Sequence, residues 1–322
     1  MNRRAKVVAV VVTWNRREIL ARNLRAVMAQ SRPVDEVLVV DNASTDGTRD
    51  MLAVEFPKAR VIRLSRNYGP AGGFFAGIYH AMKTAPDWLW LMDDDGVPGA
   101  CCLSEQLTVA HQYRFDVCGS LVHDIADPAR LAFPPPRRDL PATIDGVRRA
   151  GGTRGCLVEN PYPWNGLLVN ANVVEVIGRP KPEMFIWGEE DEYMDRAKAN
   201  KLRVGIALWA DYAHPRPNFP SRWFVNINIG RRSMRSGCYA DPTHPRAMYH
   251  ARNQGYRDWT YRGKVYGCAR LLGVGAHLTL TRGIWAAAAY IRYYIDGARD
   301  RYQLDPRRDE VLSSLTTELS GA

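Results

Sequence analysis

The sequence predicts an α/β fold in which a mainly parallel β-sheet is flanked by helices. Over the first hundred residues, short apolar runs typical of buried strands alternate with segments whose apolar residues recur at helical spacing. Polar clusters follow the apolar runs, which places them where ligands bind in parallel sheets. With 322 residues, the chain is long enough for one large domain or two modest ones.

The predicted elements of this first part alternate strictly. Apolar runs predict strands over residues 7–12, 36–40, 59–64 and 87–92, and helical spacing predicts helices over 18–30, from 44–48 onward and over 71–82. The first run follows a basic N-terminus, as in a signal peptide. It is short and lacks a small-residue cleavage site, so a first strand is the better interpretation. This alternation implies one right-handed, parallel sheet.

Beyond residue 101 the pattern is looser. Residues 133–138 and 148–154 are rich in proline, glycine and arginine, and we expect them to be mobile connecting segments. The remaining predicted elements are a strand at 165–172, a short helix at 173–177, a helix from 189 with an acidic first turn, a strand at 204–208 and two helical stretches within 266–302.

Composition and charge restrict the class of partner. No uninterrupted apolar run reaches the roughly 18 residues that span a bilayer. The six cysteines show no Cys-x-x-Cys pair and no metal-ligand spacing, which fits reduced thiols in a cytoplasmic protein. The net charge of +10 would suit nucleic acid, anionic lipid or a phosphorylated substrate. Since no nucleic-acid-binding motif is present, the latter two are favoured.

Three consecutive aspartates, Asp93, Asp94 and Asp95, follow the apolar run at 88–92. Adjacent carboxylates need a positive group nearby, and a divalent cation with oxygen ligands is the natural candidate. Side chains two apart on an extended segment point the same way, so Asp93 and Asp95 could hold one ion. An acidic turn that caps a helix is the alternative, and the triplet alone does not decide between the two.

Other polar residues should meet the triplet at the same edge of the sheet. Thr13, Asp41 and the pair Arg66-Asn67 each follow one of the predicted strands. Because the carboxyl ends of parallel strands share an edge, these clusters should converge. Glycines after Arg66 would allow close approach to a ligand, although helix–sheet packing explains such glycines about as often.

Several segments resemble a known family. Residues 10–16 (Val-Val-Val-Thr-Trp-Asn-Arg), 39–47 (Val-Val-Asp-Asn-Ala-Ser-Thr-Asp-Gly) and 93–96 (Asp-Asp-Asp-Gly) resemble inverting family-2 glycosyltransferases of the GT-A fold. Residues 66–74 are similar to a glycine-rich segment of bacterial galactofuranosyltransferases, with Pro70 in place of a glycine. The segments 131–134, 164–166, 185–190, 214–215 and 252–256 extend the likeness, which is closest to the mycobacterial galactan-initiating type.

The resemblance implies roles for individual residues. The nucleotide sugar would contact Thr13, Asp41, Arg66, Asn67, Gly72, Gly73 and Asp94. Asp93, Asp95 and His214 would hold a divalent metal, with Mn²⁺ preferred and Mg²⁺ possible. Glu190 would be the general base, and Trp164, Asn165, Trp187 and Glu189 would face the acceptor. Purely structural roles stay open as alternatives. They are capping for Asp41, a buried hydrogen-bonded ring for His214, a favourable helix start for Glu190 and core packing for the tryptophans.

The resemblance also implies an organisation and partners. Residues 1–225 would form a GT-A catalytic domain with a Rossmann-like sheet, of which 1–100 bind the nucleotide sugar and 101–225 the acceptor. Residues 226–322 would form a C-terminal helical extension, rich in tryptophan, tyrosine and arginine, that lies on a membrane or packs on the body or on another subunit.

The implied reaction moves galactofuranose from UDP-galactofuranose to a lipid-linked or polysaccharide acceptor, at the cytoplasmic face of the inner membrane. The oligomeric state stays open. One rival is a dTDP-rhamnose-dependent rhamnosyltransferase, because such enzymes share the opening strand, the Asp-Asn-x-Ser segment and the late Arg-Asn pair. Another is a nucleotide-sugar-binding scaffold without turnover, against which the metal-ligand and base candidates argue.

Overall fold

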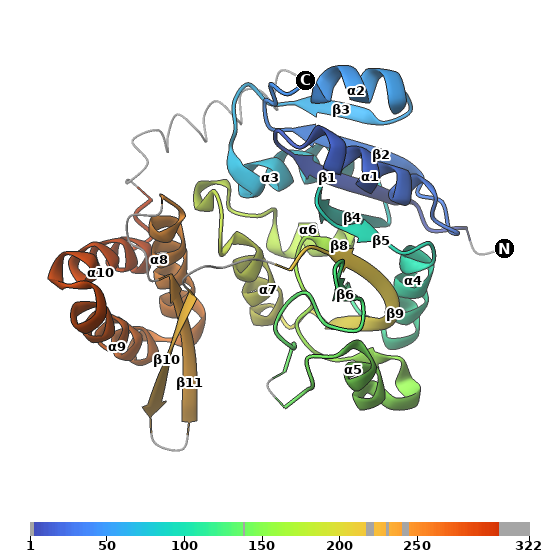
Figure 1. Ribbon diagram of the computed structural model, residues 1–322. Helices are drawn as coiled ribbons and strands as arrows, with labels where there is room; N and C mark the ends of the chain where they lie inside the picture. Colours follow the sequence, from blue (N-terminus) through green and yellow to red (C-terminus); the bar gives the residue numbers. More distant parts are fainter. Residues whose placement is uncertain (1–2, 138, 217–221, 230–231, 240–244, 303–322) are drawn as a thin grey trace. The chain divides into compact units, whose positions relative to one another are not determined.

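The computed structural model describes residues 3–137, 139–216, 222–229, 232–239 and 245–302 (Figure 1). The chain forms two compact units. The first unit comprises Met1–Pro180 and Arg196–Pro217, and the second unit comprises Lys181–Asp195 and Asn218–Ser320. The predicted boundary at residue 225 stays a prediction. The second unit takes in a segment from the middle of the chain, which no composition shift indicates.

The described part of the first unit contains one nine-stranded mixed sheet. The strands are β1 (Val7–Thr13), β2 (Glu36–Asp41), β3 (Arg60–Arg63), β4 (Trp88–Asp93), β5 (Val97–Pro98), β6 (Val117–Asp124), β7 (Cys156–Leu157), β8 (Asn165–Asn170) and β9 (Val204–His214). Their order is β3-β2-β1-β4-β8-β6-β9-β5, and β7 pairs with β9. The first four strands are parallel, as predicted.

The strand register gathers the ends of distant segments at one edge of this sheet. Strand β8 is antiparallel to β4 and to β6, while β9 is parallel to β6. The carboxyl ends of β1, β2, β4, β6 and β9 therefore lie along the same edge as the amino end of β8. The register pairs at that edge are Thr13 with Asp41, Val12 with Asp93, Met92 with Asn165, and Asp124 with His214.

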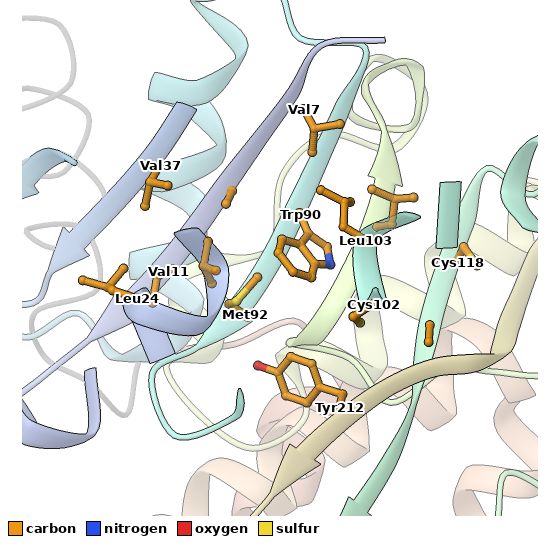
Figure 2. Packing of buried hydrophobic residues seen from close by; sticks show 14 of the residues in the cluster. Val7, Val11, Leu24, Val37, Trp90, Met92, Cys102, Leu103, Cys118 and Tyr212 are labelled. Atoms are coloured by element: carbon orange, nitrogen blue, oxygen red, sulfur yellow. The ribbon is translucent and has the colours of Figure 1, made fainter. Parts of the chain in front are cut away.

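Helices cover both faces of the sheet. Odd-numbered β1 residues such as Val7 and Val11 pack with Leu24 of α1 (Arg17–Met28), and Trp90 of β4 joins the same core (Figure 2). The helices α2 (Thr48–Glu55) and α4 (Cys102–Tyr113) contribute to this core as well. Because side chains alternate along a strand, the even-numbered β1 residues face the opposite side. There they meet α3 (Gly69–Met82).

Two glycines of α3 are required by this packing. A Cβ atom at Gly73 would overlap the Val12 side chain, and one at Gly77 would overlap Val10. The helix can therefore lie directly on the sheet. For the glycines after Arg66, the two explanations were close approach of a ligand and helix–sheet packing. Packing accounts for Gly73.

The structure differs from the prediction over residues 148–154. Helix α5 (Ile144–Gly151) and a 3₁₀ turn (Gly152–Arg154) lie where we expected a mobile segment. Ile144 and Val147 are buried in a small cluster with Leu208, and this burial stabilises the helix. The helix was not predicted because its amphipathic pattern is short and lies among arginines and glycines. The first unit is completed by α6 (Ala171–Ile177), and β9 runs six residues past the predicted end at 208, to His214.

The second unit combines a hairpin with helices. Its elements are a 3₁₀ turn (Pro182–Met184), the first turns of α7 (Glu189–Ala199), the hairpin strands β10 (Arg222–Ile229) and β11 (Arg232–Tyr239), α8 (Pro245–Arg257), a π-helical turn (Asp258–Arg262), α9 (Lys264–Arg282) and α10 (Ile284–Ala298). The two helical stretches predicted within 266–302 are confirmed, whereas the hairpin was not predicted. Residues 303–322 of the predicted extension lie outside the described residues.

A separate core holds these helices together. Ala251 of α8 packs with Val274 and Leu278 of α9 and with Tyr290 and Tyr294 of α10. Two of the tail tyrosines that could have suited a membrane surface are therefore core residues. No helix within the described part of the chain is long and apolar enough to cross a membrane.

Candidate active site

The aspartate triplet is neutralised by an arginine. Asp94 is buried, and one of its carboxylate oxygens accepts a 2.6 Å hydrogen bond from the Thr13 hydroxyl. One Nη atom of Arg16 bridges the other oxygen of Asp94 at 2.9 Å and a carboxylate oxygen of Asp95 at 2.7 Å. Part of the positive charge that the triplet needs thus comes from the protein. No role was predicted for Arg16, although this residue ends the 10–16 segment on which the resemblance partly rests.

The two bridged carboxyls differ in proton affinity. Burial raises the pKa of Asp94 to about 6, although Arg16 and Thr13 oppose that shift. Burial also acts on Asp95, but Arg16, together with His214 when Nε2 carries the second ring proton, outweighs it and holds the pKa of Asp95 at about 2. Asp95 is therefore the more firmly ionised of the pair, and the more suitable of the two to bind a cation.

His214 and Asp95, predicted as ligands of one metal, lie together. The His214 Nε2 atom is 3.1 Å from Oδ1 of Asp95, and its Nδ1 is 2.6 Å from the carbonyl oxygen of Pro215. A carbonyl can only accept, so Nδ1 carries the hydrogen and Nε2 of the neutral ring keeps its lone pair. Two electron-rich atoms then face each other, an arrangement that a cation or a second ring proton satisfies. The Phe133 ring packs against the imidazole with 4.9 Å between ring centroids.

This pair fits a divalent metal. Carboxylate oxygen and imidazole nitrogen suit Mn²⁺, and a backbone carbonyl on the far ring nitrogen is a common support for a metal-bound histidine. Among the described residues, no three His, Cys, Asp or Glu side chains already surround one point. Asp93, which ends β4, would have to approach Asp95 and His214, or ligand oxygens would have to complete the coordination. The metal site stays a prediction.

Asp41 makes the turn contact that was the structural alternative, and its second oxygen stays available for the predicted nucleotide contact. Its Oδ1 accepts a 2.8 Å hydrogen bond from the backbone N–H of Ser44, which closes the turn after β2. Its Oδ2 is buried, has no hydrogen-bond donor among the described residues, and lies 3.9 Å from Nε of Arg63. A buried carboxylate oxygen without a donor favours a ligand N–H or O–H at this place.

The loop before α3 is fixed to the sheet edge by asparagines. Asn42 accepts from the Tyr68 N–H and donates to the Gly69 carbonyl, both at 3.3 Å. Asn67 accepts from the Gly69 N–H at 2.8 Å, and the Arg66 guanidinium lies 5.0 Å from the Tyr68 ring centroid. The arginine is therefore held near the ends of the central strands. The nucleotide-sugar contacts of Arg66, Asn67, Gly72 and Gly73 stay predictions.

Two predicted acceptor residues adjoin the triplet. The Asp93 N–H donates to the Trp164 carbonyl at 2.9 Å, and the Ser120 hydroxyl donates to the Asn165 carbonyl at 2.6 Å. The Trp164 ring is buried and stacks on Phe74 with 4.2 Å between ring centroids. The Trp164 ring therefore packs in the core, which was the alternative prediction for this residue. Its backbone carbonyl, which accepts from Asp93, lies at the edge of the sheet that carries the triplet.

The remaining predicted residues belong to the second unit. Glu189 is buried and Glu190 half-buried at the start of α7. A carboxylate oxygen of Glu190 accepts a 2.8 Å hydrogen bond from the Gly188 N–H. This contact fixes the side chain against the turn that precedes the helix. The catalytic role of Glu190 and the acceptor roles of Glu189 and Trp187 stay predictions.

The acidic neighbours of the predicted base are themselves paired. Arg257 binds Asp191 at 2.7 Å and Asp195 at 2.8 Å, and the Tyr261 hydroxyl donates to Glu192 at 2.7 Å. The expected repulsion from these like charges is thus offset by groups that α8 and the following π-helical turn supply.

One buried asparagine of α8 holds the turn before this helix. The side-chain amide nitrogen of Asn253 donates to the carbonyls of Met184, Ile186 and Trp187 at 3.0–3.2 Å. Phe185 and Trp187 both have a φ of 62°, which is uncommon for large side chains. Such backbone persists only where its surroundings determine it, and Asn253 does so here.

Comparison with known proteins identifies the family. The family model described as "Glycosyl transferase family 2" matches residues 8–151. The galactofuranosyltransferase GlfT1 of Mycobacterium tuberculosis is 36% identical over 268 residues, which are 81% of this chain and 81% of that protein. GlfT1 of Mycolicibacterium smegmatis is 36% identical over 213 residues, which are 65% of this chain and 70% of that protein. The chain belongs to the family-2 glycosyltransferases and is an enzyme of that class.

Solved structures define the fold as GT-A. TarS 1–349 from S. aureus, in complex with UDP-GlcNAc, aligns with a TM-score of 0.58 at 13% identity, covering 98% of this chain and 88% of that chain. The mannosyltransferase PcManGT from Pyrobaculum calidifontis, in complex with GDP-Man and Mn²⁺, aligns with a TM-score of 0.52 at 15% identity, covering 94% and 88%. The predicted fold class is confirmed.

We expect Asn253→Ala to lower kcat about ten- to a hundredfold while the KM for the donor changes little, since the turn before Glu190 loses its support. The matched control is Gln254→Ala, which removes a buried 2.8 Å hydrogen bond from the same helix to Asp258 but none to the turn. Steady-state kinetics measure kcat and KM, and thermal unfolding shows whether either variant is less stable. The two readouts together distinguish a misplaced turn from a destabilised protein. Equal losses of kcat in both variants would contradict a positioning role.

Proposed function

We propose that the protein transfers galactofuranose from UDP-galactofuranose to a hydroxyl group of a lipid-linked or polymeric glycan, with inversion at the anomeric carbon. The geometric observation that carries the proposal is the contact between Asp95 and His214 at the edge that also holds Asp41. The 36% identity to galactofuranosyltransferases over 81% of the chain supports the choice of sugar.

The carboxyl edge of the sheet would hold the donor. The spare oxygen of Asp41 would accept a hydrogen bond from the uracil or the ribose. Arg66 would pair with the diphosphate, because a guanidinium matches phosphate oxygens in a forked geometry. Thr13 would contribute indirectly, since its hydroxyl already donates to Asp94 and its carbonyl accepts from the Asn42 N–H at 2.9 Å.

Asp95 and His214, with Asp93, would hold Mn²⁺ or, less favourably, Mg²⁺. The bound ion would supply positive charge that offsets the charge growing on the leaving diphosphate. Arg16 would keep the Asp95 carboxylate ionised and oriented towards the histidine.

Glu190 would act as the general base. It would take the proton of the acceptor hydroxyl while the acceptor oxygen bonds to the anomeric carbon and the bond to the diphosphate breaks, releasing UDP. The hydrogen bond from the Gly188 N–H would hold one carboxylate oxygen and leave the other for the proton. The reaction would take place at the cytoplasmic face of the inner membrane, where a lipid-linked acceptor is anchored.

The direct test is donor preference. With Mn²⁺ and a short synthetic galactan-type acceptor, we expect free UDP and an extended acceptor from UDP-galactofuranose, detected by nucleotide assay and mass spectrometry. Parallel reactions with dTDP-rhamnose should release no nucleotide above a no-enzyme control. Release from dTDP-rhamnose alone would replace the proposal with its rhamnosyltransferase rival.

Glu190→Gln should reduce kcat by about 10²–10⁴-fold and leave the affinity for UDP unchanged, because the amide keeps the acceptor for Gly188 but cannot take a proton. Glu175→Gln, an exposed glutamate of α6, is the matched control. Kinetics and calorimetry of UDP binding give the two readouts. Turnover near that of the unmodified protein would remove Glu190 from the mechanism.

Asp95→Asn should weaken Mn²⁺-dependent UDP binding by about tenfold or more. The amide oxygen can still accept from Arg16, so the turn itself should persist. Calorimetry with and without Mn²⁺ measures the effect, and Asp139→Asn, a surface residue paired with Arg137, serves as the control. Undiminished stimulation by Mn²⁺ would show that the ion binds elsewhere.

A further inference from the structure

The solvent-facing side of α9 carries no charge between its two ends. Its exposed residues between Lys264 and Arg282 are apolar or uncharged. They are Val265, Cys268, Leu272, Ala276, Thr279, Leu280 and Thr281. The outer face of a helix in a soluble domain is ordinarily lined with charged and polar side chains. The inner face of α9 already packs in the core of the second unit. An outer face without charges therefore needs an apolar environment of its own.

The large apolar members of this set are strongly exposed. Val265 is 79% exposed, Leu272 73% and Leu280 87%. At 3.6 residues per turn they fall on one side of the helix, over a length of about 22 Å. Val274 and Leu278 occupy the opposite side and belong to the core of the second unit.

The surface continues around the turn into α10. The turn lies at Gly283, whose φ of +89° favours glycine. The next two residues are Ile284, 67% exposed, and Trp285, 86% exposed. We call Val265, Leu272, Leu280, Ile284 and Trp285 together the apolar stripe.

The charge around the apolar stripe has one sign. Residues 259–295 contain five arginines and lysines and no aspartate or glutamate. Arg270 is buried and pairs with Asp258, and the other four, Arg262, Lys264, Arg282 and Arg292, are exposed. Lys264 lies at one end of α9, and Arg282 lies at the other, beside Ile284 and Trp285. Apolar and aromatic side chains flanked by cations match the boundary between headgroups and acyl chains in an anionic bilayer.

We propose that the apolar stripe docks onto the surface of an anionic lipid bilayer, with α9 lying in the plane of the interface and Trp285 at its leading end. The proposal extends the proposed function, whose lipid-linked acceptor would reside in the same bilayer. It concerns residues different from the tail tyrosines, because Tyr290 and Tyr294 are used in the core.

A second copy of the chain is a less suitable partner for this surface. If two stripes paired in parallel, Lys264 would face Lys264 and Arg282 would face Arg282. If they paired antiparallel, Lys264 would face Arg282. Each arrangement brings like charges together at both ends of the contact, which disfavours self-association.

The test is flotation of the full-length protein with vesicles of phosphatidylcholine alone or mixed equally with phosphatidylglycerol. We expect binding to the anionic vesicles that falls as salt rises. Leu272→Glu combined with Leu280→Glu should reduce that binding about tenfold or more. Val54→Glu combined with Val176→Glu is the matched control, since it adds the same charge at exposed valines of α2 and α6 and should leave binding unchanged.

Three outcomes would overturn the inference: no binding of the unmodified protein to anionic vesicles, equal binding by both double variants, or a dimer in sedimentation velocity that only the α9 variant abolishes. Transfer to a water-soluble acceptor is measured on the same samples. Both double variants should retain it, because all four substituted side chains are exposed and none is a predicted site residue. Loss of vesicle binding with intact transfer would leave the proposed function standing, and absent transfer from UDP-galactofuranose would overturn that function independently.

Discussion

The ion bridge from Arg16 to Asp94 and Asp95 is the interaction on which the sheet edge depends. Parallel strands bring their carboxyl ends together, and here that edge receives a run of acidic residues. Removing an ionised carboxylate from water costs on the order of several kcal/mol unless a partner compensates. Arg16 and Thr13 compensate Asp94. Asp95 is then left with one oxygen on Arg16 and the other facing His214, so two of the three predicted metal ligands are in contact.

Packing on the opposite face of the sheet sets the position of the predicted diphosphate site. Because Gly73 and Gly77 have no side chains, α3 lies directly against Val12 and Val10 of β1. The amino end of that helix, with Arg66 and Asn67 just before it, is thereby brought to the ends of β1 and β2, where Asn42 holds it. Gly73, one of the glycines that suggested ligand approach, thus acts first through packing, and any ligand contact would follow from the position that this packing allows.

Much of the first unit could be predicted because its signals are local. Each parallel strand is a short apolar run, and a polar cluster follows each of the central strands. The contact between Asp95 and His214 could be anticipated only through the resemblance, since 118 residues separate them in sequence. The bridge from Arg16 needed the turn geometry, which no periodicity shows. Helix α5 was missed because two buried apolar residues stabilise it among arginines and glycines. The hairpin β10–β11 was missed although residues 225–229 (Val-Asn-Ile-Asn-Ile) alternate as a strand does, because residues 232–239 of the second strand show no such alternation.

The second unit joins the predicted base to the apolar stripe through close backbone contacts. A Cβ atom at Gly255 of α8 would overlap the backbone of Tyr294, and one at Gly297 of α10 would overlap the Arg252 carbonyl. The two helices therefore touch backbone to backbone, and closely packed helices move as one body. Asn253 lies on the same turn of α8 and holds the segment that leads into Glu190. The orientation of α9 and α10, which a lipid surface would set, and the orientation of the turn before Glu190 are then properties of a single rigid element. Under the proposed function this would give a physical reason for one helical unit to carry both features, because an acceptor anchored in a bilayer would have to meet the predicted base at a defined height above the lipid.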